Sequence, residues 1–253
     1  MFECSVSEIV AKFDEAARHE ESVHRLAEVY RTGIMFSADN ESVRLNDTSL
    51  GLTEGRILWY LARALRPDTI IETGFGRGGS AAFLLAAMKP WEGRLISIDP
   101  AFRNWAGETG RNYLAELGLA DQHVLIEEPS ELTLADIVRR DDVSLKLSYV
   151  DGSHLFDGTL IDFIYLDRLT QVGGVIAIDD AHAPAVRTVA SFVAHNLPYK
   201  LYYATQRLVL CTKLGTNERE WCHFKPFVSS LNIDWDVHVD RPTDAAVPNA
   251  TFG

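Results

Sequence analysis

The chain has 253 residues, of which 47% are hydrophobic and 24% charged, and its formal net charge at pH 7 is −12. These values are typical of a soluble globular protein that can form one large α/β domain with an appendage. An acidic chain binds nucleic acid or an anionic membrane poorly, so we expect neither as a partner and expect a small-molecule acceptor instead.

The cysteines and the N-terminal residues predict the compartment. Cys4, Cys211 and Cys222 form no CxxC pair, and three cysteines predict neither a disulfide framework nor a zinc site. The first fifteen residues lack the basic start and apolar core of a signal peptide. No run approaches the ~18 apolar residues that a membrane span requires. Together these features predict a cytoplasmic protein.

Residues 1–50 are predicted to form a helical extension. Apolar residues between Val6 and Thr32 recur at helical spacing and indicate one or two amphipathic helices, with Ser5 or Ser7 as the first N-cap. Packing against the main domain is the simplest interpretation. A lid over the active site, or a contact in a homo-oligomer (a dimer or larger), is the alternative. Residues 33–49 are polar and weakly periodic, which predicts a loop.

Residues 51–214 alternate between strand and helix patterns. A helix is predicted at 56–65, ending before Pro67. Strands are predicted at 69–73, 95–98, 123–126, 146–150, 174–178, 199–203 and 207–212. Helices are predicted between them at about 79–89, 108–117, 131–139, 157–171 and 184–196. The alternation predicts an α/β fold with a Rossmann-like, mostly parallel sheet of seven strands and flanking helices.

The last two predicted strands are joined by only three residues, 204–206, which is too short for a crossover. They are therefore expected to be antiparallel neighbours near the C-terminal end of the domain. Residues 215–253 show no convincing period, and we expect a partly irregular C-terminal extension.

A glycine-rich turn follows the first strand of the predicted sheet. The segment TIIETGFGRGGS at 69–80 runs from a β-branched strand through Gly74 and Gly76 into an apolar helix. This order presents backbone N–H groups to a nucleotide-like ligand. Glycine is suited to the turn because it accepts positive φ and has no side chain to collide with the ligand.

The glycine pattern alone fits two cofactors. Gly74-x-Gly76-x-x-Gly79 matches the dinucleotide fingerprint, but Glu72 would repel a diphosphate and attract an amino group. Asp99 ends the second strand and can accept hydroxyls of a ribose in either cofactor. With Glu72, the stretch resembles motif I of class I S-adenosylmethionine-dependent methyltransferases, E/D-x-G-x-G. An antiparallel strand near the end of the sheet is also the layout of that family.

Ser130 follows the third strand, in a loop that borders the adenine in the family that motif I resembles. Capping of the next helix explains Ser130 equally well. From the motif and the resemblance, we predict that the cofactor contacts Glu72, Gly74, Gly76, Ser80, Asp99 and Ser130.

Three aspartates follow two neighbouring strands. Asp151 ends the fourth strand, and Asp179 and Asp180 end the fifth. Strand ends in a parallel sheet lie ~5 Å apart, so these carboxylates are expected to converge. They repel each other unless a cation lies between them, and oxygen ligands suit Mg²⁺ first, with Mn²⁺ or Ca²⁺ as alternatives. Capping of nearby turns and helices explains each aspartate singly but not their convergence.

The segment YVDGSHLFDGTLIDFIYLDRLTQVGGVIAIDDAH, residues 149–182, resembles the metal-dependent small-molecule O-methyltransferases of natural-product pathways. These are the macrocin O-methyltransferase-like and cephalosporin-hydroxylase-like enzymes. The likeness extends over about residues 50–212 and implies that Asp151, Asp179 and Asp180 bind magnesium. It also implies that His154 is the general base. Some members use an acidic residue where this chain has Ser153.

The prediction is therefore an S-adenosylmethionine-dependent, Mg²⁺-assisted O-methyltransferase. Its expected acceptor is a sugar or polyol hydroxyl of a natural product, or a catechol-like diol. His182 is a competing base. The alternatives are a metal-independent N- or O-methyltransferase of the same fold, an NAD-dependent oxidoreductase, and a catalytically silent binding protein. Glu72 and the paired aspartates argue against the oxidoreductase, and a silent protein would tolerate alanine at Asp151 or Asp179.

Overall fold

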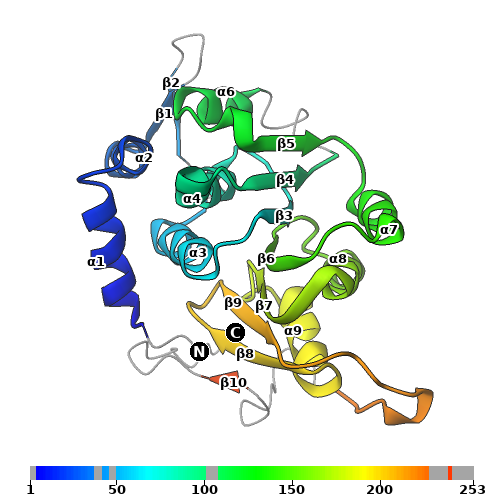
Figure 1. Ribbon diagram of the computed structural model, residues 1–253. Coiled ribbons are helices and arrows are strands. Elements are labelled where there is room, and N and C mark those ends of the chain that lie inside the picture. Colours follow the sequence, from blue (N-terminus) through cyan, green and yellow to red (C-terminus); the bar gives the residue numbers. More distant parts are fainter. Residues whose placement is uncertain (1–3, 37–41, 46–49, 101–107, 228–238, 241–253) are drawn as a thin grey trace.

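The computed structural model describes residues 4–36, 42–45, 50–100, 108–227 and 239–240. A central sheet carries helices on both faces (Figure 1). Its strands are β3 (Thr69–Thr73), β4 (Arg94–Ile98), β5 (His123–Ile126), β6 (Leu145–Val150), β7 (Thr170–Ile178), β8 (Tyr199–Tyr203), β9 (Val209–Lys213) and β10 (Val239–Asp240). Their order across the sheet is β10-β8-β9-β7-β6-β3-β4-β5.

The seven predicted strands are confirmed, and so is the antiparallel pair. Neighbours from β5 to β7 are parallel, whereas β9 lies between β7 and β8 and is antiparallel to both. The short β8–β9 connection forces this direction. The eighth strand, β10, pairs parallel with β8 from within the C-terminal extension. A strand of two residues has no hydrophobic period, so the sequence could not predict it.

The helices follow the predicted order with small differences at their ends. They are α1 (Val6–Ala16), α2 (Glu21–Thr32), α3 (Leu52–Leu65), α4 (Gly79–Met88), α6 (Thr109–Glu116), α7 (Ser130–Arg140), α8 (Phe156–Leu169) and α9 (Pro184–Asn196). Helix α3 begins at Leu52 instead of residue 56, and strand β7 begins at Thr170 instead of residue 174. Its first residues pass a register shift against β6, and Gly173 has φ +87°, so the usual strand pattern is hidden there.

Alternation along the strands divides the core into two layers. Ile70 belongs to the apolar cluster under α3, α4 and α6, and Ile71 belongs to the cluster under α7, α8 and α9. Successive side chains of a strand point to opposite faces, so one sheet supports both helical layers. No helix in the described ranges is long and apolar enough to cross a membrane.

The N-terminal extension completes the first layer. Helix α4 is buried over Ser80–Met88, and a helix without a polar face needs cover on every side. The Tyr30 ring of α2 lies 5.2 Å from the Phe83 ring of α4, and the Phe13 ring of α1 lies 5.4 Å from the Trp59 ring of α3. Ser5 is the N-cap of α1, as one of the two predicted candidates. These helices therefore pack against the main domain.

The predicted loop at residues 33–49 is wrong in part. Strand β1 (Ile34–Phe36) pairs antiparallel with β2 (Ser42–Arg44). Three-residue strands offer too short a pattern to be distinguished from a loop. Residues 37–41 and 46–49 lie outside the described part of the chain, as do the last residues of the C-terminal extension.

Candidate active site

A cavity of about 640 Å³ opens at the carboxyl ends of the central strands. One wall is the glycine turn with Asp99, and another is the segment from Asp151 to His154 that follows β6. The N-terminal extension supplies apolar lining: Tyr30, Met35, Leu45 and Leu50. Ligands of open α/β sheets bind at this end, so the cavity is the candidate active site.

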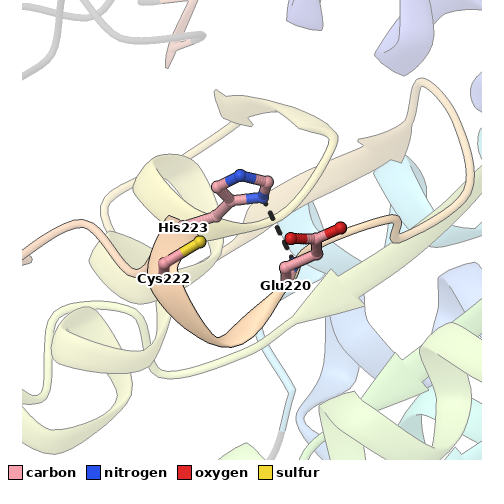
Figure 2. Close-up of side chains that lie close together, drawn as sticks. All are labelled: Glu220, Cys222 and His223. Atoms are coloured by element: carbon pink, nitrogen blue, oxygen red, sulfur yellow. Dashed lines mark hydrogen bonds between the residues drawn. The ribbon is translucent and has the colours of Figure 1, made fainter.

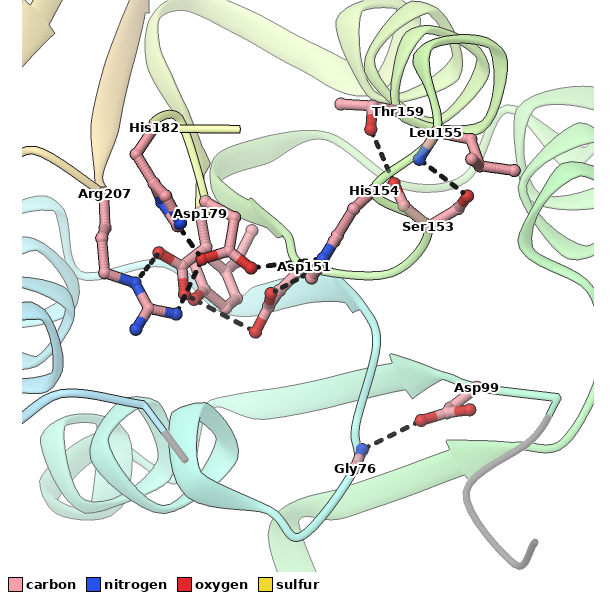
Figure 3. A network of polar contacts seen from close by, with 12 residues as sticks. Gly76, Asp99, Asp151, Ser153, His154, Leu155, Thr159, Asp179, His182 and Arg207 are labelled. Atoms are coloured by element: carbon pink, nitrogen blue, oxygen red, sulfur yellow. Dashed lines mark hydrogen bonds and ion pairs between the residues drawn. The ribbon is translucent and has the colours of Figure 1, made fainter. Parts of the chain in front are cut away.

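Asp99 lies against the glycine turn. Asp99 Oδ2 accepts hydrogen bonds from the backbone N–H of Phe75 (3.0 Å) and from that of Gly76 (2.9 Å), which Figure 3 shows. Gly74 has φ +88°, and a Cβ there would lie 2.1 Å from the carbonyl oxygen of Asp151. Glycine at this position lets the turn pass directly against the end of β6.

Glu72 lies behind the cavity and is fully buried. Its carboxylate accepts hydrogen bonds from Ser80 Oγ (2.8 Å) and Ser97 Oγ (2.5 Å), and Ser97 Oγ lies 2.7 Å from His123 Nε2. Burial raises the pKa of Glu72 to about 8 and lowers that of His123 to about 4. Of the predicted cofactor contacts, Ser80 lines the cavity, whereas Glu72 lies one hydrogen bond behind it.

Ser130 lines the cavity but does not cap a helix. It is the first residue of α7, whose N-cap is Pro129, and its hydroxyl donates a 2.6 Å hydrogen bond to Asp162 Oδ1. Burial raises the pKa of Asp162. The capping interpretation is therefore wrong, because the hydroxyl is directed to a carboxylate on α8.

The predicted acidic residues converge beside the cavity (Figure 3). Asp151, His154 and Asp180 each offer an atom within 4.8 Å of the others. His154 Nε2 lies 3.5 Å from Asp151 Oδ1, and its Nδ1 lies 3.2 Å from Asp180 Oδ2. The hydrogen bond to Asp151 raises the pKa of His154, while burial opposes that rise. His182 Nδ1 is 3.6 Å from Asp180 Oδ1, at the outer side of the cluster.

Asp179 lies deeper than the other two aspartates and is 4% exposed. Its Oδ2 accepts a 2.9 Å hydrogen bond from the Tyr149 hydroxyl, but its Oδ1 is buried without a hydrogen-bond partner among the described residues. Burial and the charge of Asp151 raise the pKa of Asp179 to about 7. An orphaned carboxylate oxygen next to two further carboxylates fits a hard divalent cation. The closest set is nevertheless Asp151, His154 and Asp180, with Asp179 behind it.

Two side chains of this cluster were missed by the sequence reasoning. Tyr149 is two residues before Asp151 and points to the same face of the sheet, a signal that strand alternation offered. Arg207 comes from the connection between β8 and β9, and its Nη2 lies 2.7 Å from Asp180 Oδ1. No local pattern marks Arg207, because the sheet topology alone brings that connection to the end of β7.

A second group of side chains that could bind a cation lies after β9, and the evidence for it is weaker. Glu220, Cys222 and His223 lie together on one short turn (Figure 2), and all three are exposed. The backbone N–H of Glu220 donates to His223 Nδ1 over 3.2 Å, which occupies one imidazole nitrogen. We assign this turn no role.

Comparison with known proteins agrees with the fold. Residues 71–181 match the family described as "Methyltransferase domain". No curated protein matches the sequence. Three similar crystal structures are a Podospora anserina methyltransferase, PaMTH1, bound to SAH, the Streptomyces achromogenes O-methyltransferase TomG with SAM, and a Bacillus cereus O-methyltransferase with SAH.

The sequence identities to these three are 18%, 22% and 13%, with TM-scores of 0.58, 0.55 and 0.59. The alignments cover 77%, 78% and 82% of this chain and 88%, 91% and 100% of the others. Residues 71–181 therefore match a methyltransferase domain, and the chain has the Rossmann-like fold of these methyltransferase structures.

Proposed function

We propose that the protein transfers a methyl group from S-adenosylmethionine to a hydroxyl of a small molecule, with a divalent cation, magnesium first, at the acidic cluster. The observation that carries this proposal is a single cavity lined both by the glycine turn with Asp99 and by Asp151 with His154. A cofactor on the first wall would present its methyl group toward an acceptor held at the second.

The reaction is an in-line displacement at the sulfonium carbon. The acceptor oxygen forms a bond to the methyl carbon, the carbon–sulfur bond breaks, and S-adenosylhomocysteine leaves neutral. The hydroxyl proton passes to a base, for which we propose His154, because it lines the cavity and contacts Asp151 and Asp180. When bound, the cation would acidify and orient the acceptor hydroxyl. Asp151 and Asp180 would hold it, with Asp179 behind them.

The acceptor proposed is one with two neighbouring oxygens, such as a sugar, a polyol or a catechol-like diol of a natural product. Two adjacent oxygens suit a cation held by carboxylates on one side only. The apolar lining from Tyr30, Met35, Leu45 and Leu50 favours an acceptor with an apolar part next to these oxygens. TomG, a similar structure, is an O-methyltransferase involved in tomaymycin synthesis.

Isothermal titration with S-adenosylhomocysteine and, separately, NAD tests the cofactor, each with Mg²⁺ and with EDTA. Micromolar binding of S-adenosylhomocysteine alone is expected. Binding of NAD alone would mean that the cavity serves an oxidoreductase.

A pair of variants separates the two walls of the cavity. Asp151→Asn should abolish cation-dependent activity while S-adenosylhomocysteine affinity stays within about tenfold, because the carboxylate is lost only at the cation wall. Asp99→Asn should show the reverse, with weaker cofactor binding and unchanged Mn²⁺ binding. Survival of activity in Asp151→Asn would leave the metal-independent methyltransferase as the better function.

A further inference from the structure

The guanidinium of Arg207 already occupies part of the acidic cluster. Its Nη2 lies 2.7 Å from Asp180 Oδ1, and its Nε lies 4.0 Å from Asp179 Oδ1 (Figure 3). Asp180 is itself held in a left-handed conformation with φ +50°. One cation therefore contacts two of the three carboxylates that the proposed function assigns to a divalent ion.

The position of Arg207 is fixed by its backbone and not by the ion pair alone. Its carbonyl accepts a 2.7 Å hydrogen bond from the N–H of Ala181, next to Asp180. Its N–H donates to Thr205 Oγ1 over 3.1 Å, and that hydroxyl donates to Glu54 Oε1 on α3 over 2.8 Å. The connection between β8 and β9 is thus tied to the turn after β7 and to α3, and it delivers the side chain to the cluster.

Arg207 alone leaves the cluster incompletely satisfied. Among the described residues, Asp179 Oδ1 and Arg207 Nε are both buried without a hydrogen-bond partner, although they face each other. The remaining oxygen of Asp180, Oδ2, faces His154 at 3.2 Å. A buried carboxylate oxygen without a donor points to a further cation, and Arg207 already pairs with the neighbouring carboxylate of Asp180.

We propose that Arg207 is the resident counterion of the acidic cluster, which competes with the divalent cation for Asp180 and thereby sets the affinity of the site for that cation. The proposal rests on the cation part of the proposed function. Without the divalent ion, the guanidinium offsets the repulsion between Asp151, Asp179 and Asp180. An ion held through Asp180 would be repelled by a guanidinium on the same carboxylate, so its binding would displace Arg207 or be weakened by it.

Calorimetric titration with Mn²⁺ and with Mg²⁺ tests the competition in the full chain. Arg207→Gln removes the charge but keeps a hydrogen-bond donor, and it should bind Mn²⁺ at least ~10-fold more tightly than the wild type. Arg207→Lys keeps the charge and should remain within about threefold of the wild type. Retained S-adenosylhomocysteine binding shows that each variant is folded.

Arg187→Gln is the matched control. The Nε of Arg187 donates to the Ala181 carbonyl over 3.1 Å, so it holds the same turn, but it makes no ion pair with a carboxylate of the described residues. Its Mn²⁺ affinity should equal that of the wild type. A gain in Arg187→Gln as large as in Arg207→Gln would mean that loosening the turn, and not removing the charge, strengthens binding, and it would overturn the competition.

Thermal unfolding provides a second readout. Arg207→Gln should melt below the wild type in EDTA and recover in saturating Mn²⁺, because a ligand that binds only the native state stabilises it. Unchanged or weaker Mn²⁺ binding in Arg207→Gln, with clear binding by the wild type, would overturn the role of Arg207 and leave the proposed function in place. Absence of Mn²⁺ and Mg²⁺ binding in both proteins would overturn the cation in the proposed function as well.

Discussion

The hydroxyl of Tyr149 donates a 2.9 Å hydrogen bond to Asp179 Oδ2, so the innermost carboxylate of the cluster is held by a phenol from the neighbouring strand. Both side chains are buried. Burial, first of all, raises the pKa of Tyr149 well above that of a free phenol, so the hydroxyl keeps its proton and remains a donor. The strand pairing of β6 with β7 therefore decides which oxygen of Asp179 remains for a cation.

Tyr149→Phe tests this relationship. Loss of the hydroxyl removes the donor to Asp179 Oδ2, while Oδ1 already has no hydrogen-bond partner among the described residues. The free energy of unfolding by urea in EDTA should therefore fall by roughly 1–3 kcal/mol. Tyr113→Phe is the control, because the Tyr113 hydroxyl is buried without a hydrogen-bond partner in the described part of the chain. That change should be near neutral. Equal losses in the two variants would contradict a specific role for the Tyr149–Asp179 hydrogen bond.

Glu72→Gln should change how stability depends on pH. Burial raises the pKa of Glu72 to about 8, against 4.5 in the unfolded chain. Between these two pH values the native state binds more protons than the unfolded state. The contribution of Glu72 to the free energy of unfolding is therefore full below pH 4.5 and is lost as the pH rises through 8. Glutamine does not titrate. Its amide oxygen can accept from one of the two serine hydroxyls, and its amide nitrogen can donate to the other.

Urea unfolding is measured at a series of pH values. From pH 5 to pH 9, the free energy of unfolding of Glu72→Gln should rise by roughly 2–4 kcal/mol relative to that of the wild type. A constant difference between the two proteins across this range would show that Glu72 titrates at an ordinary pKa despite its burial.

Gly74→Ala should disturb the cavity through two separate effects. Its φ of +88° strains any side chain, and the new Cβ would lie 2.1 Å from the Asp151 carbonyl oxygen. Gly173→Ala isolates the first effect, because Gly173 has φ +87° and no atom within 4 Å of such a Cβ.

In urea unfolding, Gly173→Ala should lower the free energy of unfolding by about 1 kcal/mol. Gly74→Ala should lower it by at least ~1 kcal/mol more, and it should also weaken Mn²⁺ binding at Asp151. Similar costs in both variants, with Mn²⁺ binding intact, would mean that the turn after β3 can move away from β6 freely.

His154→Gln should lower the rate of methyl transfer by about 10²–10⁴-fold while S-adenosylhomocysteine binding stays within about threefold, because general-base catalysis contributes that much and the cofactor wall is untouched. The measurement is S-adenosylhomocysteine release with a panel of catechol, polyol and sugar acceptors. His182→Gln is the companion variant, since His182 also lies near Asp180 and is equally exposed at 50%. A large loss in His182→Gln alone would assign the base to His182.

The sequence by itself determined the succession of strands and helices, the glycine turn and the acidic ends of two neighbouring strands. These follow from local rules: hydrophobic period, the conformational freedom of Gly74, and the alternation that puts Asp151 and Asp179 at adjacent strand ends. The antiparallel β9 was equally predictable, because the connection from β8 is too short to make a crossover. Resemblance to a family added the roles of these residues, which no period or spacing contains.

Only the tertiary structure decided how the side chains meet. Arg207 lies 27 positions after Asp180, and Ser97 lies 25 positions after Glu72, so their pairing depends on sheet order and not on any local pattern. The depth of each carboxylate was likewise set by packing, which buries Glu72 behind Ser80 and puts Tyr149 against Asp179. Long-range contacts fix burial and hydrogen-bond partners, and these control the charge of each group.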